Sequence, residues 1–389
     1  MVSEQNRWLP HPLSGSSLRN LVRVLARHGL HIEPRRWPRF LTAAAAVTAA
    51  TPLRLWEQHR HGSAIAQQTI DQPPIMILGH WRSGTTNLHN LLLCDERFAS
   101  VSLLHCSIPH LHLTLGNTIG RFVQRRLGKT RPMDAVPLGI HEPMSEDFGL
   151  VGRSDQTHYG SYFFPQHAEA EFRRTVLFDG PNANKAIASW ERDYTQLLQN
   201  VTYESGGKRL CLKNPPNTGR VRHVLKLFPD AKFIFVRRNP YLVHASTCRL
   251  MERFLDQFAL QRWDREHIEN FVSLRYEQLM QKWFADRDAI PDQNLIELSH
   301  EEITASPIGV IESIYSKLNL PGFDDIQPAL QQRVRGDADY RNNKYRFDDA
   351  YLGRIEPHLA RTAKLWNYSP PNQRPNRPPP NLCRAPATK

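Results

Sequence analysis

GHWRSGTTN, residues 79–87, lies between the apolar run PIMILG, which ends in glycine, and a run of helical periodicity from Thr86 to Leu93. The phosphate-binding loop of nucleotide triphosphatases has the form G-x-x-x-x-G-K-[ST], in which the lysine contacts the terminal phosphates and the hydroxyl binds magnesium. Gly79 and Gly84 keep this spacing, but Thr85 occupies the position of the lysine. The stretch therefore predicts a strand, an anion-binding loop and a helix, without the usual support for magnesium.

The cation of this loop is Arg82, which lies inside it. A turn from a strand into a helix offers backbone N–H groups and a helix N-terminus to an oxyanion. The hydroxyls of Ser83, Thr85 and Thr86 are additional donors. We interpret the loop as an anion site; the alternative is a Gly-Ser-Thr turn that only caps a helix.

A second candidate anion site is RRNPYLVHAS, residues 237–246, where an apolar strand ends on two arginines and an Asn-Pro turn opens a helix. Ser246 follows Arg238 by eight residues, about two helical turns, so both side chains can bind one phosphate. Taken alone, the motif is equally typical of a surface turn with a salt bridge. Together, the two sites indicate a ligand with two separate phosphate groups.

Strands and helices alternate along the middle of the chain. KRLCLKNPPN, residues 208–217, is a short strand that ends in a turn before the helical VRHVLKLFPD, and KFIFVRRNP supplies a third strand. This alternation predicts an α/β, P-loop-like three-layer fold with a central, mostly parallel sheet flanked by helices. Ligands of such sheets bind at the carboxyl ends of the strands.

Three segments are expected along the chain. Residues 1–72 form an N-terminal helical appendage, residues 73–368 form the main domain, and residues 369–389 form a Pro-rich flexible tail. The Ala-rich run 40–53 is broken by Pro52, and its length of about 14 residues is too short to span a bilayer. The first residues lack the layout of a secretory signal.

The composition favours a globular protein with an anionic partner. Fifty Lys and Arg against 38 Asp and Glu give a net charge of +12, which attracts anionic ligands, nucleic acid or an acidic membrane surface. The five cysteines show no C-x-x-C spacing, which disfavours a disulfide framework and a zinc site. We therefore expect a cytoplasmic protein, with peripheral membrane contact through the basic N-terminal helices left open.

From about Pro74 to Tyr368, the sequence resembles the sulfotransferases that use 3′-phosphoadenosine-5′-phosphosulfate (PAPS). GHWRSGTTNLHNLL is similar to their 5′-phosphosulfate loop, and RRNPYLVHAS is similar to their 3′-phosphate site, including the eight-residue offset. LKNPPNTGRVRHVLKLFPDAKF and LSHEEITASPIGVIESIYSKLNL are similar to two further segments. The resemblance implies transfer of a sulfonate from PAPS to a hydroxyl, with 3′,5′-ADP as product and no metal.

The resemblance also implies roles for individual residues. Charge that develops on the bridging oxygen during sulfonate transfer needs a cation and N–H donors nearby, and Arg82 is the candidate. Lys213 either points at the donor sulfonate or only serves its own turn. The remaining donor-binding candidates are Ser83, Gly84, Thr85 and Thr86 at the 5′-phosphate, and Arg238, Ser246, Arg341 and Lys344 at the 3′-phosphate.

A hydroxyl acceptor needs a base, and HEPMSEDFGL, residues 141–150, offers four candidates: His141, Glu142, Glu146 and Asp147. Relatives carry an acidic pair after a proline here, which favours Glu146 with Asp147 behind it; the alternative is a solvated acidic turn. Some members place a histidine after the Lys-Asn-Pro turn, where this chain has Asn217, which accepts no proton at neutral pH.

Several alternatives stay open. HCSIPHLH, residues 105–112, has metal-binding residue types without zinc-finger spacing, so we expect a loop that lines the acceptor pocket. A metal-dependent P-loop kinase or nucleotidase is the second enzyme class. A basic module that binds nucleic acid or a membrane surface would explain the charge alone, but no nucleic-acid motif is present. The acceptor can be a lipid, a glycan or a small alcohol.

Overall fold

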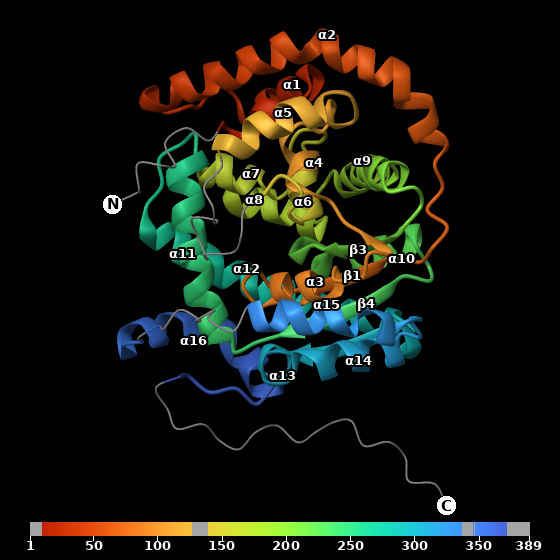
Figure 1. Ribbon diagram of the computed structural model, residues 1–389. Coiled ribbons are helices and arrows are strands. Elements are labelled where there is room, and N and C mark those ends of the chain that lie inside the picture. The colour runs from red at the N-terminus through yellow and green to blue at the C-terminus, as the bar shows by residue number, and fades with distance from the viewer. Residues whose placement is uncertain (1–9, 127–138, 337–344, 346, 372–389) are drawn as a thin grey trace, which may run out of the picture.

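A five-stranded parallel sheet forms the centre of the protein in a computed structural model that describes residues 10–126, 139–336, 345 and 347–371 (Figure 1). The sheet has the order β2-β3-β1-β4-β5, and every neighbouring pair is parallel. Its strands are β1 (Ile75–Gly79), β2 (Phe98–Ala99), β3 (Arg209–Lys213), β4 (Lys232–Arg237) and β5 (Leu295–Ser299). The predicted α/β fold with a central parallel sheet is confirmed.

Helices surround the sheet. Those before β3 are α1 (Leu18–His28), α2 (Trp37–Gln67), α3 (Thr85–Leu92), α4 (Leu103–Ser107), α5 (His112–Arg126), α6 (Glu146–Leu150), α7 (Gly160–Phe163), α8 (Ala168–Phe172) and α9 (Ala183–Glu204). Those after it are α10 (Val221–Leu227), α11 (Pro240–Phe258), α12 (Arg265–Asp286), α13 (His300–Ala305), α14 (Pro307–Lys317), α15 (Phe323–Gly336) and α16 (Asp349–Leu365).

The central strands β1 and β4 are apolar along most of their length, as expected for strands that are covered on both faces of a parallel sheet. Alternate residues of β1 enter different cores: Ile75 and Ile77 join the cluster formed with α3, α14 and α15. Met76 and Leu78 join the larger cluster with α9, α11, α12 and α16. On that larger side, Phe235 of β4 stacks on Trp283 of α12 with ring centroids 4.0 Å apart.

The chain order of the strands positions the site. From the central β1, the next two strands lie on one side and the last two on the other. The carboxyl ends of β1, β3 and β4 therefore meet at one edge, which brings Gly79, Lys213 and Arg238 close to one another. Such a switch of direction is where ligands of open α/β sheets bind.

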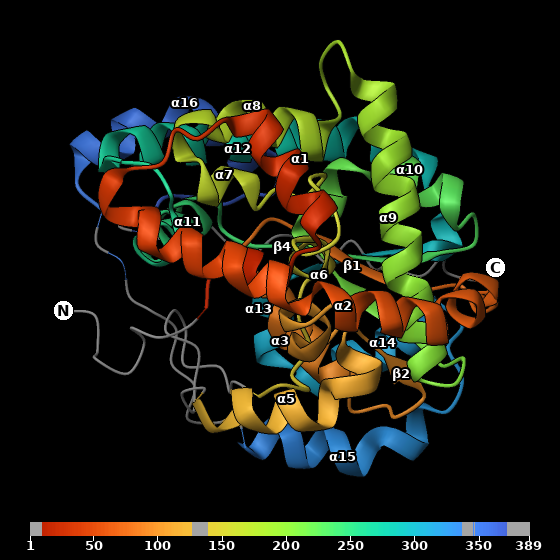
Figure 2. The same ribbon diagram turned by 90° about the horizontal axis from the view of Figure 1, so that it is seen from above.

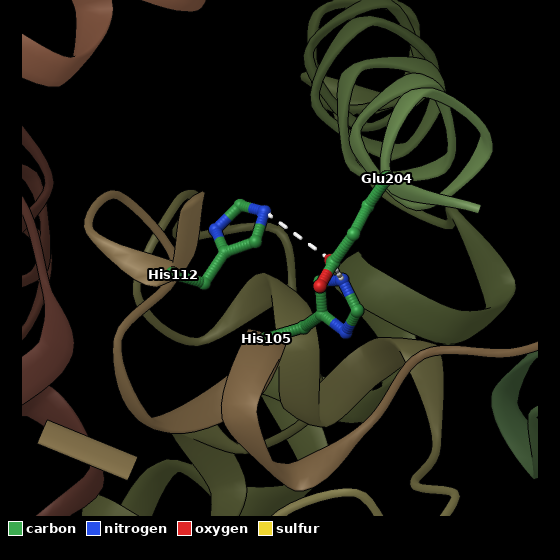
Figure 3. Close-up of side chains that lie close together, drawn as sticks. All are labelled: His105, His112 and Glu204. Atoms are coloured by element: carbon green, nitrogen blue, oxygen red, sulfur yellow. Dashed lines mark ion pairs between the residues drawn. The ribbon is translucent and has the colours of Figure 1, made fainter. Parts of the chain in front are cut away.

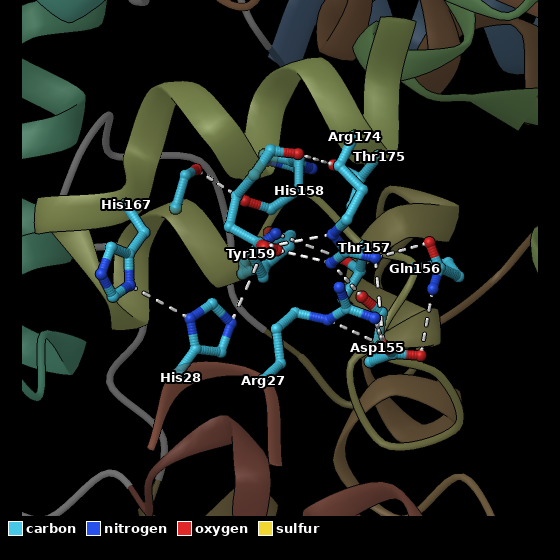
Figure 4. Close-up of polar contacts among 12 residues, drawn as sticks. Arg27, His28, Asp155, Gln156, Thr157, His158, Tyr159, His167, Arg174 and Thr175 are labelled. Carbon is cyan, nitrogen blue, oxygen red and sulfur yellow. Dashed lines mark hydrogen bonds and ion pairs between the residues drawn. The ribbon is translucent and has the colours of Figure 1, made fainter. Parts of the chain in front are cut away.

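The N-terminal helices pack onto this domain (Figure 2). Leu21 of α1 and Val47 of α2 belong to the large core. Arg27 donates two hydrogen bonds to Asp155, at 3.1 and 2.7 Å (Figure 4). His28 stacks on Phe164. No described helix combines the length and the apolar composition needed to cross a bilayer.

The sequence wrongly predicts a break at Pro52, which lies inside the continuous helix α2. A proline removes one intrahelical hydrogen bond, but Pro52 is exposed, so water can replace the missing donor. The division into segments 1–72, 73–368 and 369–389 stays a prediction, and residues 372–389 lie outside the described residues.

Candidate functional site

The backbone conformation at the end of the β1–α3 loop, directly before α3, requires glycine. Gly84 has φ +102°, and a Cβ there would lie 2.4 Å from Nδ1 of His300. Thr218, in the turn after β3, ties the start of the loop: its Oγ1 accepts from Gly79 N (2.9 Å) and donates to Gly79 O (3.1 Å). Arg82 also has a positive φ, of 69°. The loop is thus held in one shape from both flanking segments.

The N-terminus of α3 is the anion-binding end of this loop. The Ser83 side chain is buried, and its hydroxyl has no hydrogen-bond partner among the described residues. Buried polar groups are rarely left unpaired. The first N–H groups of α3, at Thr85 and Thr86, have no acceptor within the helix. A hydroxyl and helix N–H groups that lack acceptors suit a bound oxyanion.

Hydrogen bonds join the loop to the end of β4. Arg238, directly after β4, donates from its guanidinium to the backbone oxygen of Arg82 at 3.0 Å. Arg82 in turn donates from Nε to Oγ of Ser246 on α11, also at 3.0 Å. The structure therefore brings together the two arginines and the serine that the sequence selected from distant motifs.

His300 completes this side of the site and was missed by the sequence interpretation. It is the first residue of α13, directly after β5, and packs against Gly84. Burial and the nearby charge of Arg238 lower the pKa of His300 to about 4, so the imidazole is neutral at pH 7. Strand β5, which the sequence analysis did not identify, places His300 beside the β1–α3 loop.

Glu146 lies at the start of α6, beside the end of β3. Its Oε1 accepts a hydrogen bond from the backbone N of Lys213 at 2.9 Å. Its Oε2 is buried and accepts no hydrogen bond from a described residue. Burial raises the pKa of Glu146 to about 7, although the charge of Lys213 opposes the rise. A carboxyl of this kind exchanges a proton near neutral pH.

Asp147, the next residue, is in a different electrostatic environment. Arg220 donates to its Oδ1 at 2.6 Å, and both side chains are fully buried. Thr157 and His158 donate to Oδ2. Burial alone would raise the pKa of Asp147, but the Arg220 charge and the His158 hydrogen bond hold it well below its usual range. Asp147 therefore stays ionised.

His158 is the second residue that the sequence interpretation missed. Its Nδ1 lies 2.7 Å from Oδ2 of Asp147 and must donate, because an ionised carboxylate only accepts. Its Nε2 is buried and has no hydrogen-bond partner among the described residues. The ring centroid lies 5.1 Å from that of Trp81 in the β1–α3 loop. A carboxylate that orients an imidazole is a known arrangement for a base.

The other two candidates for the base, His141 and Glu142, line a cleft of about 520 Å³ beside β2 and the end of α9. His105 of the HCSIPHLH segment lies there too. That the HCSIPHLH segment lines the acceptor pocket stays a prediction. Arg341 and Lys344 lie outside the described residues.

His105, His112 and Glu204 face one another beside this cleft (Figure 3). Nε2 of His105 lies 2.6 Å from Oε2 of Glu204, and Nε2 of His112 lies 3.8 Å from the same oxygen. These residue types bind metals. However, Ser102 N donates to Nδ1 of His105 at 3.0 Å, so the proton of a neutral ring is on Nε2. That proton opposes coordination there and accounts for the close contact with Glu204.

Comparison with known proteins identifies the family. Residues 73–325 match the sulfotransferase family, and the chain belongs to it. The resemblance found in the sequence is therefore confirmed. The omega-hydroxy-beta-dihydromenaquinone-9 sulfotransferases Stf3 of Mycobacterium bovis and Mycobacterium tuberculosis are each 27% identical over 367 residues, which is 94% of this chain and 94% of each relative.

Solved structures share the fold. Sulfotransferase STF9 from Mycobacterium avium has a TM-score of 0.68 and 17% identity, covering 87% of this chain and 88% of that chain. Sulfotransferase STF1 from Mycobacterium tuberculosis has a TM-score of 0.65 and 17% identity, covering 87% and 90%.

Asp147→Asn should lower the free energy of unfolding by about 3 kcal/mol or more, because it leaves the Arg220 charge buried without its partner. Urea denaturation measures this loss. The control is Asp179→Asn, which breaks an exposed ion pair with Arg173 and should leave stability unchanged within error. Equal effects of the two substitutions would show that the buried pair contributes nothing special.

Glu146→Gln should stabilise the protein relative to wild type at pH 8 but not at pH 5. The raised pKa means that the folded state binds the proton of Glu146 more tightly than the unfolded chain, so wild type loses stability as pH rises from about 4.5 to about 7. Glutamine carries no proton to lose. Thermal unfolding should show a difference of a few degrees at pH 8, and the same difference at both pH values would contradict the raised pKa.

Proposed function

We propose that this sulfotransferase moves a sulfonate group from PAPS to a hydroxyl of a lipid-like acceptor, with 3′,5′-ADP as product. The observation that carries the proposal is the hydrogen-bonded set of Arg238, Arg82 and Ser246. A nucleotide with phosphates only at the 5′ position would need the β1–α3 loop alone. The additional arginine and serine at the end of β4 support a second phosphate, which PAPS has and ATP lacks.

The donor site fits this ligand. Ser83, with its unpartnered hydroxyl, is the best-supported contact for the 5′-phosphate, together with Gly84, Thr85 and Thr86 at the start of α3. Arg238 and Ser246 bind the 3′-phosphate in this proposal. Arg341 and Lys344 are proposed to cover that phosphate as well.

Arg82 connects the two proposed phosphate sites. Its backbone belongs to the loop, while its Nε donates to Ser246. We therefore infer that Arg82 contributes to donor binding and to the stabilisation of charge, which extends the role expected from the sequence. Lys213, buried at the end of β3 near Glu146, is the second cation proposed for the reacting end.

The bound donor supplies a sulfonate whose departure leaves negative charge on a phosphate oxygen. The cations Arg82 and Lys213 and the N–H groups of α3 offset that charge without a metal ion in this proposal. A divalent ion would be needed by a P-loop kinase or nucleotidase, the alternative function. Transfer that persists with EDTA separates the two.

Glu146 is the proposed base. Burial raises the pKa of Glu146 to about 7, and its Oε2 is available for a proton. Asp147 is too weakly basic at neutral pH, and we assign it a positioning role through Arg220 and His158. His158 is the second candidate for the base, because Asp147 orients it and its Nε2 has no described partner.

The acceptor proposal rests on the curated relatives, whose name specifies a hydroxylated menaquinone. Since the similarity extends over 94% of both chains, we propose a hydroxyl group on a similarly apolar molecule as the acceptor class.

The described cysteines form no disulfide, which supports the expected cytoplasmic location.

3′,5′-ADP should raise the thermal unfolding midpoint strongly, and 5′-AMP should raise it far less, because only the former occupies both phosphate sites. Arg238→Ala should weaken binding of 3′,5′-ADP by about 2 kcal/mol and reduce the difference between the two nucleotides. Differential scanning fluorimetry measures both effects. Equal stabilisation by the two nucleotides would remove the support for a 3′-phosphate site.

Glu146→Gln should lower turnover by about 100-fold or more while 3′,5′-ADP still stabilises the variant, because the base is lost and the donor site is intact. The measurement is transfer of label from radiolabelled PAPS to a hydroxylated menaquinone, with EDTA present. In wild type, turnover should rise with pH through about 7, as Glu146 with its raised pKa loses its proton.

His158→Gln is the companion variant for this experiment. It removes the imidazole, the second candidate for the base, and keeps a side chain that can form hydrogen bonds. Retained activity in Glu146→Gln together with loss in His158→Gln would transfer the role of base to the imidazole.

A further inference from the structure

Exposed apolar side chains are concentrated at one end of the chain. Of the eight large hydrophobic residues that are exposed among the described ones, seven lie between residues 18 and 56. They are Leu18, Val22, Leu30, Leu41, Leu53, Leu55 and Trp56, with exposed fractions from 46 to 62%. Single exposed leucines are ordinary on a protein surface, but exposed apolar residues that share one face of a helix mark a contact surface.

Four of these residues lie on the outward side of α2. The opposite side of the helix packs on the protein through Phe40, Ala43 and Val47, which are buried. The exposed residues of its middle part are Leu41, Thr42, Ala45, Ala46, Thr48, Ala49, Pro52, Leu53, Leu55 and Trp56, which we call the α2 strip. The strip contains no charged residue over about 24 Å of helix.

The one charge in this part of α2 turns away from the strip. Arg54 is partly buried and donates to the backbone oxygen of Ser14. Figure 1 shows α2 along the upper edge of the molecule, and Figure 2, seen from above, shows it running across the near side. The strip is therefore an outer surface of the protein and not part of the contact between α2 and the domain.

Positive charge lies at both ends of the strip. Arg35 and Arg36 precede α2, and Arg60 follows Trp56 by one turn, with its guanidinium 5.6 Å from the ring centroid. Residues 10–67 contain eight arginines and only two acidic residues. Those two, Glu33 and Glu57, are partly and fully buried. The exposed charge around the strip is thus entirely positive within residues 10–67.

We propose that the α2 strip rests on the surface of an anionic lipid bilayer, with the arginines at its ends contacting the headgroups. An apolar helix face with basic flanks is the pattern of helices that lie in the membrane interface. A second copy of the chain fits less well, because pairing two strips across a two-fold axis would bring arginine-rich ends together. The contact is made by the apolar strip, whereas the sequence suggested only the basic residues.

The proposal is independent of the donor and the base, although an apolar acceptor would be found in the same bilayer. The test is co-sedimentation of the full chain with vesicles of phosphatidylcholine, with or without phosphatidylglycerol. Wild type should bind the anionic vesicles, and high salt should weaken the binding. Leu53→Asp combined with Trp56→Asp should reduce the bound fraction by about tenfold or more.

Leu365→Asp is the matched control, because Leu365 is the eighth exposed hydrophobic residue and lies on α16. It should bind vesicles like wild type. Both variants should keep the unfolding midpoint of wild type and its response to 3′,5′-ADP, since the changed side chains are exposed.

Three results would overturn the proposal. The first is no binding of wild type to anionic vesicles, and the second is equal loss of binding in the Leu365 control. The third is a wild-type dimer in solution that becomes a monomer in the Leu53 and Trp56 variant, which would identify a second copy as the occupant. Light scattering without vesicles measures the oligomeric state.

Discussion

The buried ion pair between Asp147 and Arg220 is the interaction on which the geometry of the site depends. Arg220 also donates from Nε to the backbone oxygen of Thr175 at 2.8 Å, and its guanidinium lies 5.1 Å from the ring centroid of Trp190. One guanidinium thus holds α6, the segment before α9 and α9 itself against the turn that follows β3. Because Asp147 is fixed in this way, its neighbour Glu146 is fixed beside the end of β3.

Two adjacent carboxyl groups acquire opposite proton affinities from this arrangement. Asp147 faces a guanidinium and an imidazole N–H, which keep it ionised. Glu146 accepts a hydrogen bond from the backbone N–H of Lys213 and is fully buried, and this burial raises its pKa to about 7. Pairs of acids whose environments separate their pKa values divide the work of positioning and of proton transfer. Both carboxyl groups are fully buried, so the distinction arises from their partners: Arg220 and His158 offset the effect of burial on Asp147, whereas the charge of Lys213 only partly offsets it on Glu146.

The sequence predicted the parts of the site that are local and failed for those that depend on distant contacts. The loop at 79–87, the strands after it and the Arg238–Ser246 pair are local patterns of apolar runs, turns and spacing. Strand β2 has two residues, and β5 is half-buried, so neither produces a clear apolar run. His158 is positioned by the carboxylate of Asp147 and by the ring of Trp81, which no local sequence pattern connects to it. A choice among the four candidate bases depends on how deeply each side chain is buried, and the sequence does not give this burial.

In the β1–α3 loop, the cation is Arg82 rather than the lysine of a nucleotide triphosphatase, and it is held by residues that follow β4 and lie on α11. A Walker lysine comes from the helix that follows the loop and acts together with magnesium. Arg82 has a backbone of positive φ whose oxygen Arg238 holds, while its side chain reaches Ser246. The two predicted phosphate sites are therefore one connected structure rather than two separate ones. The charges of Arg82 and Arg238 are thus positioned by hydrogen bonds that join the loop to the end of β4 and to α11, whereas the triphosphatase motif positions its cation as a lysine at the place that Thr85 occupies here.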